Sequence, residues 1–298
     1  MKKISLNSIL GQYTKDDFMP YYLEDRPFIV HNQTESFKEL FSLSLLNSID
    51  DLLKLWPKEV GSYNQGIADE GNSIKVSISE AKALFHSGRG LYFDDPNTID
   101  STINKWLMGI KEDLGLSNLT YSRSLIYAIK KGFGTATHFD QNINFVLQVH
   151  GTKKWWIAPN THVKNPMTRH TLGLEIDPEL KSYTDSEMPI SIPENAIEYT
   201  LEPGSMLFVP RGAWHKTEAL SDALSLNFTY SAPTWIDLVT TTIRARLVQS
   251  EKWRETANFV NDPVLYPKAL ETLDDLLADL SVDMLDWRAS NILGLTES

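Results

Sequence analysis

The residues best suited to chemistry lie between Gly132 and Lys154 and in one later segment, FVPRGAWHKTEAL. The first stretch contains His138 and Asp140, and the later segment contains His215. Residues two apart on an extended strand point to the same face, so His138 and Asp140 can bind one metal ion together. Two histidines and one carboxylate form the facial triad that holds non-haem Fe(II) and leaves its other positions open for substrate and oxygen. The spacing therefore predicts an iron site.

A His-x-Asp pair alone is a weak signal, because a half-buried histidine beside a carboxylate is a common structural arrangement. The surrounding sequence makes it more specific. The segment HFDQNINFVLQVHGTKKWWIAP resembles the core of JmjC-type, cupin-fold 2-oxoglutarate oxygenases, and most closely the branch that hydroxylates an asparagine of hypoxia-inducible factor. Beyond the triad, the residues at the family's positions are Tyr92, Thr135, Asn144, Gly151, Lys153 and Asn227. The matches cover residues 85–232, roughly half of the chain.

The resemblance implies a role for each matched side chain. His138, Asp140 and His215 would hold the iron and form the catalytic centre. 2-Oxoglutarate would bind the iron at one end and present its distal carboxylate to a cation and hydroxyl donors at the other. A lysine ammonium suits that task as a compact charge with three donors. The cosubstrate-binding residues implied are Lys153, Thr135 and Tyr92 for the distal carboxylate, and Asn144 and Asn227 beside the metal, where they would orient carboxylates.

The same resemblance implies a mainly β fold, a cupin-type double-stranded β-helix (jelly roll) with helices added at both ends. The turns between short apolar runs in the second half of the core suit such an antiparallel double-sheet barrel. We expect an oxygenase domain over residues 1–232, with its core over 85–232 and a lead-in of helices and strands over 1–84. Residues 233–298 are expected to form a C-terminal helical region, because leucines recur at helical spacing between Leu270 and Leu280. This region is a candidate homodimer interface.

Residues 159–198 form a long, irregular, proline-containing insertion within the expected barrel. Loops of this length in a compact domain are usually functional or mobile. We therefore expect a lid or a wall of the substrate site. His162 and His170 lie in this insertion, and we interpret them as loop histidines rather than as a second metal site.

The composition excludes several classes of protein. The chain of 298 residues is 42% hydrophobic and 22% charged, which is typical of a folded globular protein. A net charge of −11 and the absence of basic runs argue against a nucleic-acid partner. The chain has no cysteine, so disulfides and thiolate metal sites are excluded. With no signal-peptide pattern and no apolar stretch of about 20 residues, we expect no membrane partner and a cytoplasmic location.

The resulting prediction is an Fe(II)- and 2-oxoglutarate-dependent dioxygenase that uses O2 and releases succinate and CO2. It would hydroxylate an unactivated C–H bond, in the side chain of a protein or peptide. The alternatives within the enzyme class are a hydroxylase of a free amino acid or small metabolite and a demethylase of N-methyl-lysine. The alternatives outside it are a non-catalytic metal-binding cupin sensor and a metal-dependent isomerase or other dioxygenase on the same barrel.

Overall fold

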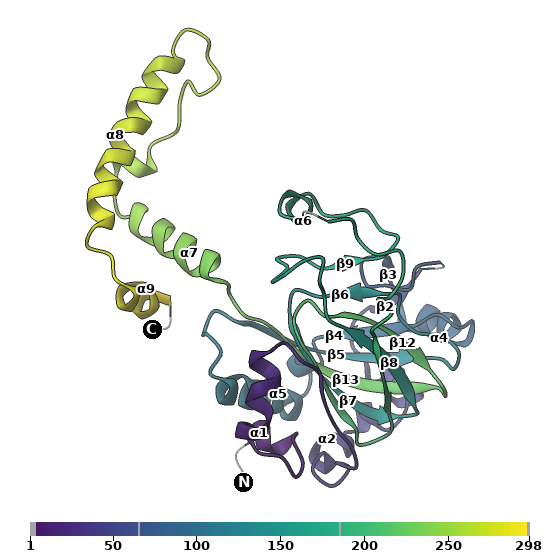
Figure 1. Cartoon of the computed structure of the whole chain (residues 1–298). Coiled ribbons are helices and arrows are strands. Elements are labelled where there is room, and N and C mark those ends of the chain that lie inside the picture. Colours follow the sequence, from purple (N-terminus) through teal and green to yellow (C-terminus); the bar gives the residue numbers. More distant parts are fainter. Residues whose placement is uncertain (1–3, 65, 185, 297–298) are drawn as a thin grey trace. The chain divides into compact units, whose positions relative to one another are not determined.

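The structure is a computed structural model that describes residues 4–64, 66–184 and 186–296. It contains two compact units. The first comprises residues 1–115 and 121–231, and the second comprises residues 116–120 and 232–298. All the β-strands belong to the first unit (Figure 1).

The larger sheet of the first unit has eight strands in the order β1-β11-β7-β13-β5-β4-β2-β3. Every named pairing in it is antiparallel. The strands are β1 (Phe28–Val30), β2 (Val60–Tyr63), β3 (Ser73–Val76), β4 (Leu91–Asp94), β5 (Tyr121–Ile129), β7 (Ile143–His150), β11 (Met206–Val209) and β13 (Ala223–Ser231).

The smaller sheet has five strands in the order β10-β8-β12-β6-β9, also antiparallel. Its strands are β6 (His138–Phe139), β8 (Lys153–Ala158), β9 (His170–Thr171), β10 (Ile197–Leu201) and β12 (Trp214–Ala219). Strand β9 and the short helix α6 (Pro178–Ser182) come from the long insertion, so this segment is partly ordered by pairing with the sheet.

The two sheets share one hydrophobic core. A cluster of buried residues joins Val146 and Leu207 of the larger sheet to Trp155 and Ile157 of the smaller one. Strand β8 alternates between buried and half-buried residues, as expected for a strand with one face on the core. Strand β7 is buried almost throughout, because aromatic residues such as Phe18 cover its other face at Phe145.

Short helices flank the larger sheet (Figure 1). The longest, α5, is amphipathic: an Asp100 side chain caps its first N–H groups, and it ends at Gly115 in the left-handed conformation. Its buried Ile103, Trp106 and Ile110 recur at helical spacing. The helices of this unit are η1 (Leu6–Ser8), α1 (Lys15–Leu23), α2 (Lys38–Phe41), η2 (Ser44–Leu46), α3 (Ile49–Leu55), α4 (Ile78–His86), η3 (Pro96–Thr98), α5 (Ser101–Leu114) and α6.

The second unit is helical, with α7 (Trp235–Leu247), η4 (Lys252–Arg254), α8 (Tyr266–Met284) and α9 (Ala289–Thr296). Helix α8 carries the leucine stripe expected from the sequence, yet none of its 19 residues is buried. Among the described residues, no helix is long and apolar enough to cross a membrane. The mainly β architecture with helices at both ends is confirmed.

Candidate active site

The three predicted metal ligands meet at one end of the space between the sheets. His138 on β6 and His215 on β12 are direct register partners, and their ring centroids lie 4.1 Å apart. Asp140 follows β6 immediately, with its Oδ2 atom 3.7 Å from His215 Nε2. One ligand atom from each residue lies within 4.8 Å of the others. This is the three-ligand arrangement that holds a metal on one face.

Each histidine of the triad is oriented by a backbone carbonyl. His138 Nδ1 lies 2.8 Å from Ala136 O, and His215 Nδ1 lies 2.9 Å from Ala213 O. A carbonyl can only accept, so Nδ1 carries the proton and Nε2 is free to bind a metal. Burial, followed by the neighbouring His138, lowers the pKa of His215 to about 3. His215 is therefore neutral, as a ligand must be.

Asp140 is ionised and partly shielded, with 19% of its side chain exposed. Burial alone would raise its pKa, but the Arg169 guanidinium and then the two histidines lower that pKa to about 2. The Asn144 amide donates to Asp140 Oδ2 at 3.3 Å, and Asn144 is itself fixed by the Thr229 hydroxyl. Asn144 therefore lies where it can orient the carboxylate toward a metal.

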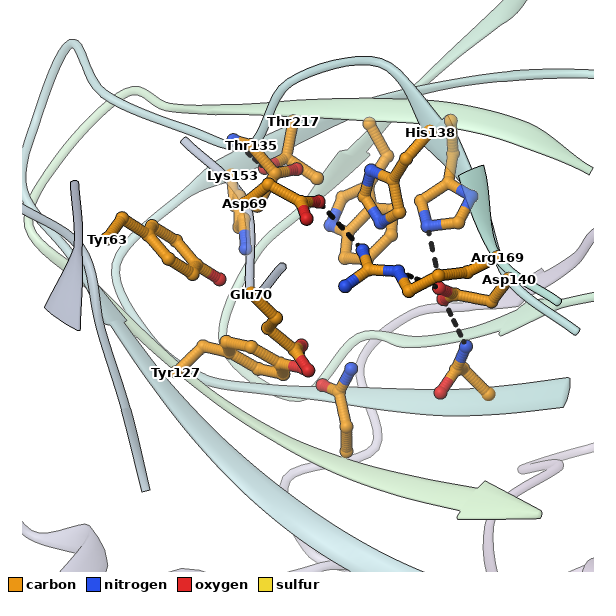
Figure 2. A pocket seen from close by; sticks show the side chains of 14 residues that line it. Tyr63, Asp69, Glu70, Tyr127, Thr135, His138, Asp140, Lys153, Arg169 and Thr217 are labelled. Atoms are coloured by element: carbon orange, nitrogen blue, oxygen red, sulfur yellow. Dashed lines mark hydrogen bonds and ion pairs between the residues drawn. The ribbon is translucent and has the colours of Figure 1, made fainter. Parts of the chain in front are cut away.

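Lys153 lies at the far end of the same cavity from the triad (Figure 2). Lys153 pairs in register with Ala219 of β12. Ala219 lies four residues after His215, and four residues of an extended strand span about 13 Å. Trp155 and Thr217 lie between these two levels on the same inward face. The Thr135 and Thr217 hydroxyls lie 2.9 Å apart and also line the cavity. The cavity thus has a metal-ligand end and a cationic end.

Several buried polar atoms along this cavity have no protein partner. Lys153 is 3% exposed, and no hydrogen bond or ion pair to its ammonium exists among the described residues; its Nζ lies 5.2 Å from the Trp155 ring centroid and 5.8 Å from that of Tyr127. Burial lowers the pKa of Lys153 to about 8. Asn227 Oδ1 and Trp155 Nε1 are buried and unpaired as well. Unpaired buried polar groups are costly, so this pattern fits a cavity built to receive a polar, anionic ligand.

The structure does not place Tyr92 among the residues that line the cavity, so its expected contact with the distal carboxylate stays a prediction. It faces the same side of the sheet as its register partner Tyr127, and its ring stacks on Tyr63 with the ring centroids 5.8 Å apart. The Tyr92 hydroxyl instead contacts Ser73 at 2.7 Å. Tyr63 and Tyr127 line the cavity in its place. Thr135, Asn144, Lys153 and Asn227 all line it, as expected.

Sequence reasoning missed three charged residues that line the cavity, Asp69, Glu70 and Arg169 (Figure 2). Asp69 and Glu70 come from the β2–β3 loop, and no pattern in that loop indicated them. Arg169 comes from the insertion that was expected to be a lid or a substrate wall. Thr217 was also missed, although the period of two along β12 from His215 could have identified it.

Comparison with known proteins agrees with this geometry. Residues 109–238 match the JmjC domain family, and this range contains the whole triad and Lys153. The crystal structure of the ribosomal oxygenase YcfD from Escherichia coli in complex with cobalt and 2-oxoglutarate aligns with a TM-score of 0.56 at 17% identity, over 90% of this chain and 67% of that one. At this identity the likeness shows a shared fold, which confirms the cupin-type core.

Relatives by sequence include the Bacillus subtilis protein YxbC, which is 29% identical over 92% of this chain and 84% of its own length. Ribosomal oxygenase 1 of Danio rerio is 28% identical over 72% of this chain, but only 38% of its own length is matched. This chain therefore spans little more than a third of that relative.

The JmjC domain, the fold and the histidine–aspartate triad define the class of protein: a 2-oxoglutarate- and iron-dependent dioxygenase. Within that class, the relatives with a named activity include ribosomal oxygenases.

Proposed function

We propose that this chain is a hydroxylase that inserts one oxygen atom into an amino-acid side chain of a protein and releases succinate and CO2. The observation that carries the proposal is the presence, in one cavity, of the triad at one end and the partnerless ammonium of Lys153 at the other. This pair of features suits a dicarboxylate that binds the metal with one end. A metal-binding cupin without catalysis has no need of the lysine.

Each site residue has a defined task in this reaction. His138, Asp140 and His215 hold the iron, and Asn144 keeps the Asp140 carboxylate oriented toward it. When bound, the iron would supply oxygenase chemistry with O2 as the oxidant: one oxygen atom would go to the succinate formed from 2-oxoglutarate with loss of CO2, and the other to the substrate C–H bond. Trp155 stacks on the His215 ring at 5.7 Å and limits the access of water to that ligand.

The cationic end of the cavity binds the distal carboxylate of 2-oxoglutarate. Lys153 supplies the charge, while Thr135, Thr217 and Tyr63 supply hydroxyl groups around it. Asn227, whose Oδ1 is unpaired in the empty cavity, lies in the lining where it can contact the bound cosubstrate.

For the substrate we favour a protein side chain, and ribosomal proteins are the first candidates to test. The support is the name "ribosomal oxygenase" carried by relatives that share the JmjC domain or the fold. The finer assignment to the asparaginyl-hydroxylase branch stays a prediction. A free amino acid or small metabolite is the alternative substrate, and N-methyl-lysine demethylation is the alternative outcome.

The experiment is mass spectrometry of ribosomal proteins from a strain of the source organism that lacks this enzyme. They are incubated with Fe(II), 2-oxoglutarate and either the wild-type protein or Asp140→Ala. A mass gain of one oxygen on one peptide, with the wild type alone, supports the proposal. Formaldehyde release with loss of a methyl group would instead indicate demethylation. Succinate formed only when small molecules are added would indicate a metabolite hydroxylase.

We also propose that the second unit mediates homodimerisation. Leu270, Leu273 and Leu277 of α8 are each more than 40% exposed, and an apolar stripe of this kind is usually covered in the functional assembly. Light scattering on the full chain should show a dimer, and truncation before Asp237 should give a monomer. A truncated chain with unchanged oligomeric state would exclude these helices as the interface.

A further inference from the structure

Arg169 lies opposite Asp140 because of strand pairing. In the β6–β9 ladder, His138 pairs with Thr171 and Phe139 with His170. Continuing that antiparallel register by one residue brings Arg169 to the level of Asp140, and Arg169 Nε lies 3.4 Å from Asp140 Oδ1. The insertion thus delivers a second cation to the cavity, between Asp69 and Asp140 (Figure 2).

One edge of the Arg169 guanidinium is held by a hydrogen bond, and the other forms an ion pair with Asp140 without a hydrogen bond. Its Nη2 donates to Asp69 Oδ2 at 2.7 Å. Asp69 is 2% exposed and is held in turn by the Thr171 hydroxyl and the Gly71 N–H. In contrast, Arg169 Nε is buried and has no hydrogen-bond acceptor within the described part of the chain, even though Asp140 is near. A fixed guanidinium with an unused N–H is prepared to bind an anion.

The net charge of the groups around the cavity indicates which anion Arg169 would bind. Asp69 and Asp140 balance Arg169 and Lys153, while Glu70 is paired with Arg123 at 3.5 Å. Fe(II) adds two positive charges and 2-oxoglutarate adds two negative ones. The cavity is therefore electrically balanced when it is empty and when it holds both, but unbalanced when it holds either one alone. Buried unbalanced charge is costly, so the two should bind cooperatively.

We propose that Arg169 is a second cosubstrate-binding residue, which binds the carboxylate of 2-oxoglutarate at the metal end while Lys153 binds the other. A metal ion bound to Asp140 neutralises the negative charge of that carboxylate. The positive charge of Arg169 is then no longer balanced by Asp140 and attracts another anion. The metal-end carboxylate provides it. Asp69 acts as a positioning residue that holds Arg169 through its outer edge.

This role makes two predictions of different sign for Arg169→Gln. Removing a positive charge beside the metal site should leave Fe(II) affinity unchanged or tighter when 2-oxoglutarate is absent. Removing a charge-assisted hydrogen bond should weaken 2-oxoglutarate binding to the metal-loaded protein by about tenfold or more. A residue that only orients Asp140 would behave differently, because its loss would weaken metal binding itself.

The test is anaerobic titration of the full chain by calorimetry, first with Fe(II) and then with 2-oxoglutarate. Arg169→Lys, which keeps the charge but loses the planar fork, should lose less 2-oxoglutarate affinity than Arg169→Gln. Asp69→Asn removes a negative charge, which alone would favour the dianion, but it also releases the outer edge of Arg169; a net loss of 2-oxoglutarate affinity would therefore report the positioning of Arg169. Arg211→Gln is the matched control, because Arg211 donates to Pro166 O at 2.7 Å and anchors the same insertion away from Asp140.

The proposal is overturned if Arg169→Gln binds 2-oxoglutarate within twofold of the wild type. It is also overturned if metal affinity falls as much as 2-oxoglutarate affinity, or if Arg211→Gln reproduces the effect. Should Arg169→Gln fail to fold, the same two constants for Arg169→Lys and Asp69→Asn decide. These are binding measurements without a substrate, so their outcome is independent of whether a protein side chain is hydroxylated.

Discussion

His138 and His215 face one another as direct register partners of two antiparallel strands, with their rings 4.1 Å apart. The metal site is therefore a property of the β6–β12 ladder. A shift of that register by one residue would turn one histidine to the opposite face of the sheet. The third ligand, Asp140, follows on the same chain segment as His138, so a single pairing assembles the triad.

Asp140→Ala should weaken Fe(II) binding more than about 100-fold, because it removes a ligand, whereas loss of an outer hydrogen-bonding partner typically costs 10–100-fold. The Asn144 amide donates to Asp140, so Asn144→Ala is the matched variant and should show the smaller loss of Fe(II) affinity. Anaerobic calorimetry measures both affinities, and circular dichroism should show an unchanged fold for Asp140→Ala. An unchanged Fe(II) affinity would remove Asp140 from the ligand set.

The affinity for 2-oxoglutarate should fall as the pH rises above about 8. Burial lowers the pKa of Lys153 from 10.5 to about 8, so the empty protein loses the ammonium there. Binding of a dianion requires that proton, and the expected loss is about tenfold per pH unit. The Lys153→Met variant should bind weakly and without this dependence. A wild-type affinity that stays constant from pH 7 to 9.5 would contradict this role of Lys153.

The same pKa has an opposite effect on stability in the absence of ligand. Because the folded-state pKa is lower than the unfolded one, the unfolded chain binds more protons between pH 8 and 10.5. The free energy of unfolding contributed by this site therefore rises with pH over that interval. Denaturant titrations of the wild type and Lys153→Met across this range isolate the contribution as a difference; a difference independent of pH would show that the lysine is not buried as described.

Tyr63→Phe should weaken 2-oxoglutarate binding, whereas Tyr92→Phe should leave it within twofold. Tyr63 lines the cavity, where its hydroxyl can donate to a bound carboxylate. Loss of a hydrogen bond to a charged group costs about 1.5–3 kcal/mol, or roughly tenfold or more in affinity. The Tyr92 hydroxyl is engaged by Ser73 outside the cavity. The reverse ranking in calorimetry would restore Tyr92 to the role expected from the sequence.

Gly151→Ala should cost more stability than Gly115→Ala. Both glycines have a left-handed φ, +69° and +68°, so alanine is strained by about 1–2 kcal/mol at either position. A Cβ at Gly151 would lie 2.1 Å from Asp222 O, whereas nothing lies within 4 Å at Gly115. This clash adds about 1–3 kcal/mol at Gly151. Urea unfolding measures the difference, and equal losses would show that the turn before Lys153 can move aside.

The sequence predicted those parts of the site that depend on strand periodicity. His138 and Asp140 are two apart, and the apolar runs before His215 and around Asn227 define the strands that carry them. Lys153 was expected from the resemblance to JmjC-type oxygenases rather than from periodicity, and the structure places it two residues from Trp155 on the same face of β8. Period-two spacing is a local property, and it survives folding whenever the strand forms.

The parts that were missed depend on pairings between distant segments. Arg169 reaches Asp140 only because the two-residue strand β9 pairs with β6, and so short a strand leaves no periodic signal. Asp69 lies in a loop and becomes part of the site only through Arg169 and Thr171. Tyr92 and Tyr127 are register partners on neighbouring strands, so strand periodicity alone could not show which of them lines the cavity.

The most direct test of the central claim is an anaerobic titration of the metal-free protein with Fe(II) and then 2-oxoglutarate, followed by visible absorption. The wild type should show a charge-transfer band of the Fe(II)–2-oxoglutarate complex, and Lys153→Ala should show a weaker band at the same ligand concentration. Iron binding without any such band, or a band that Lys153→Ala leaves unchanged, would contradict the central claim.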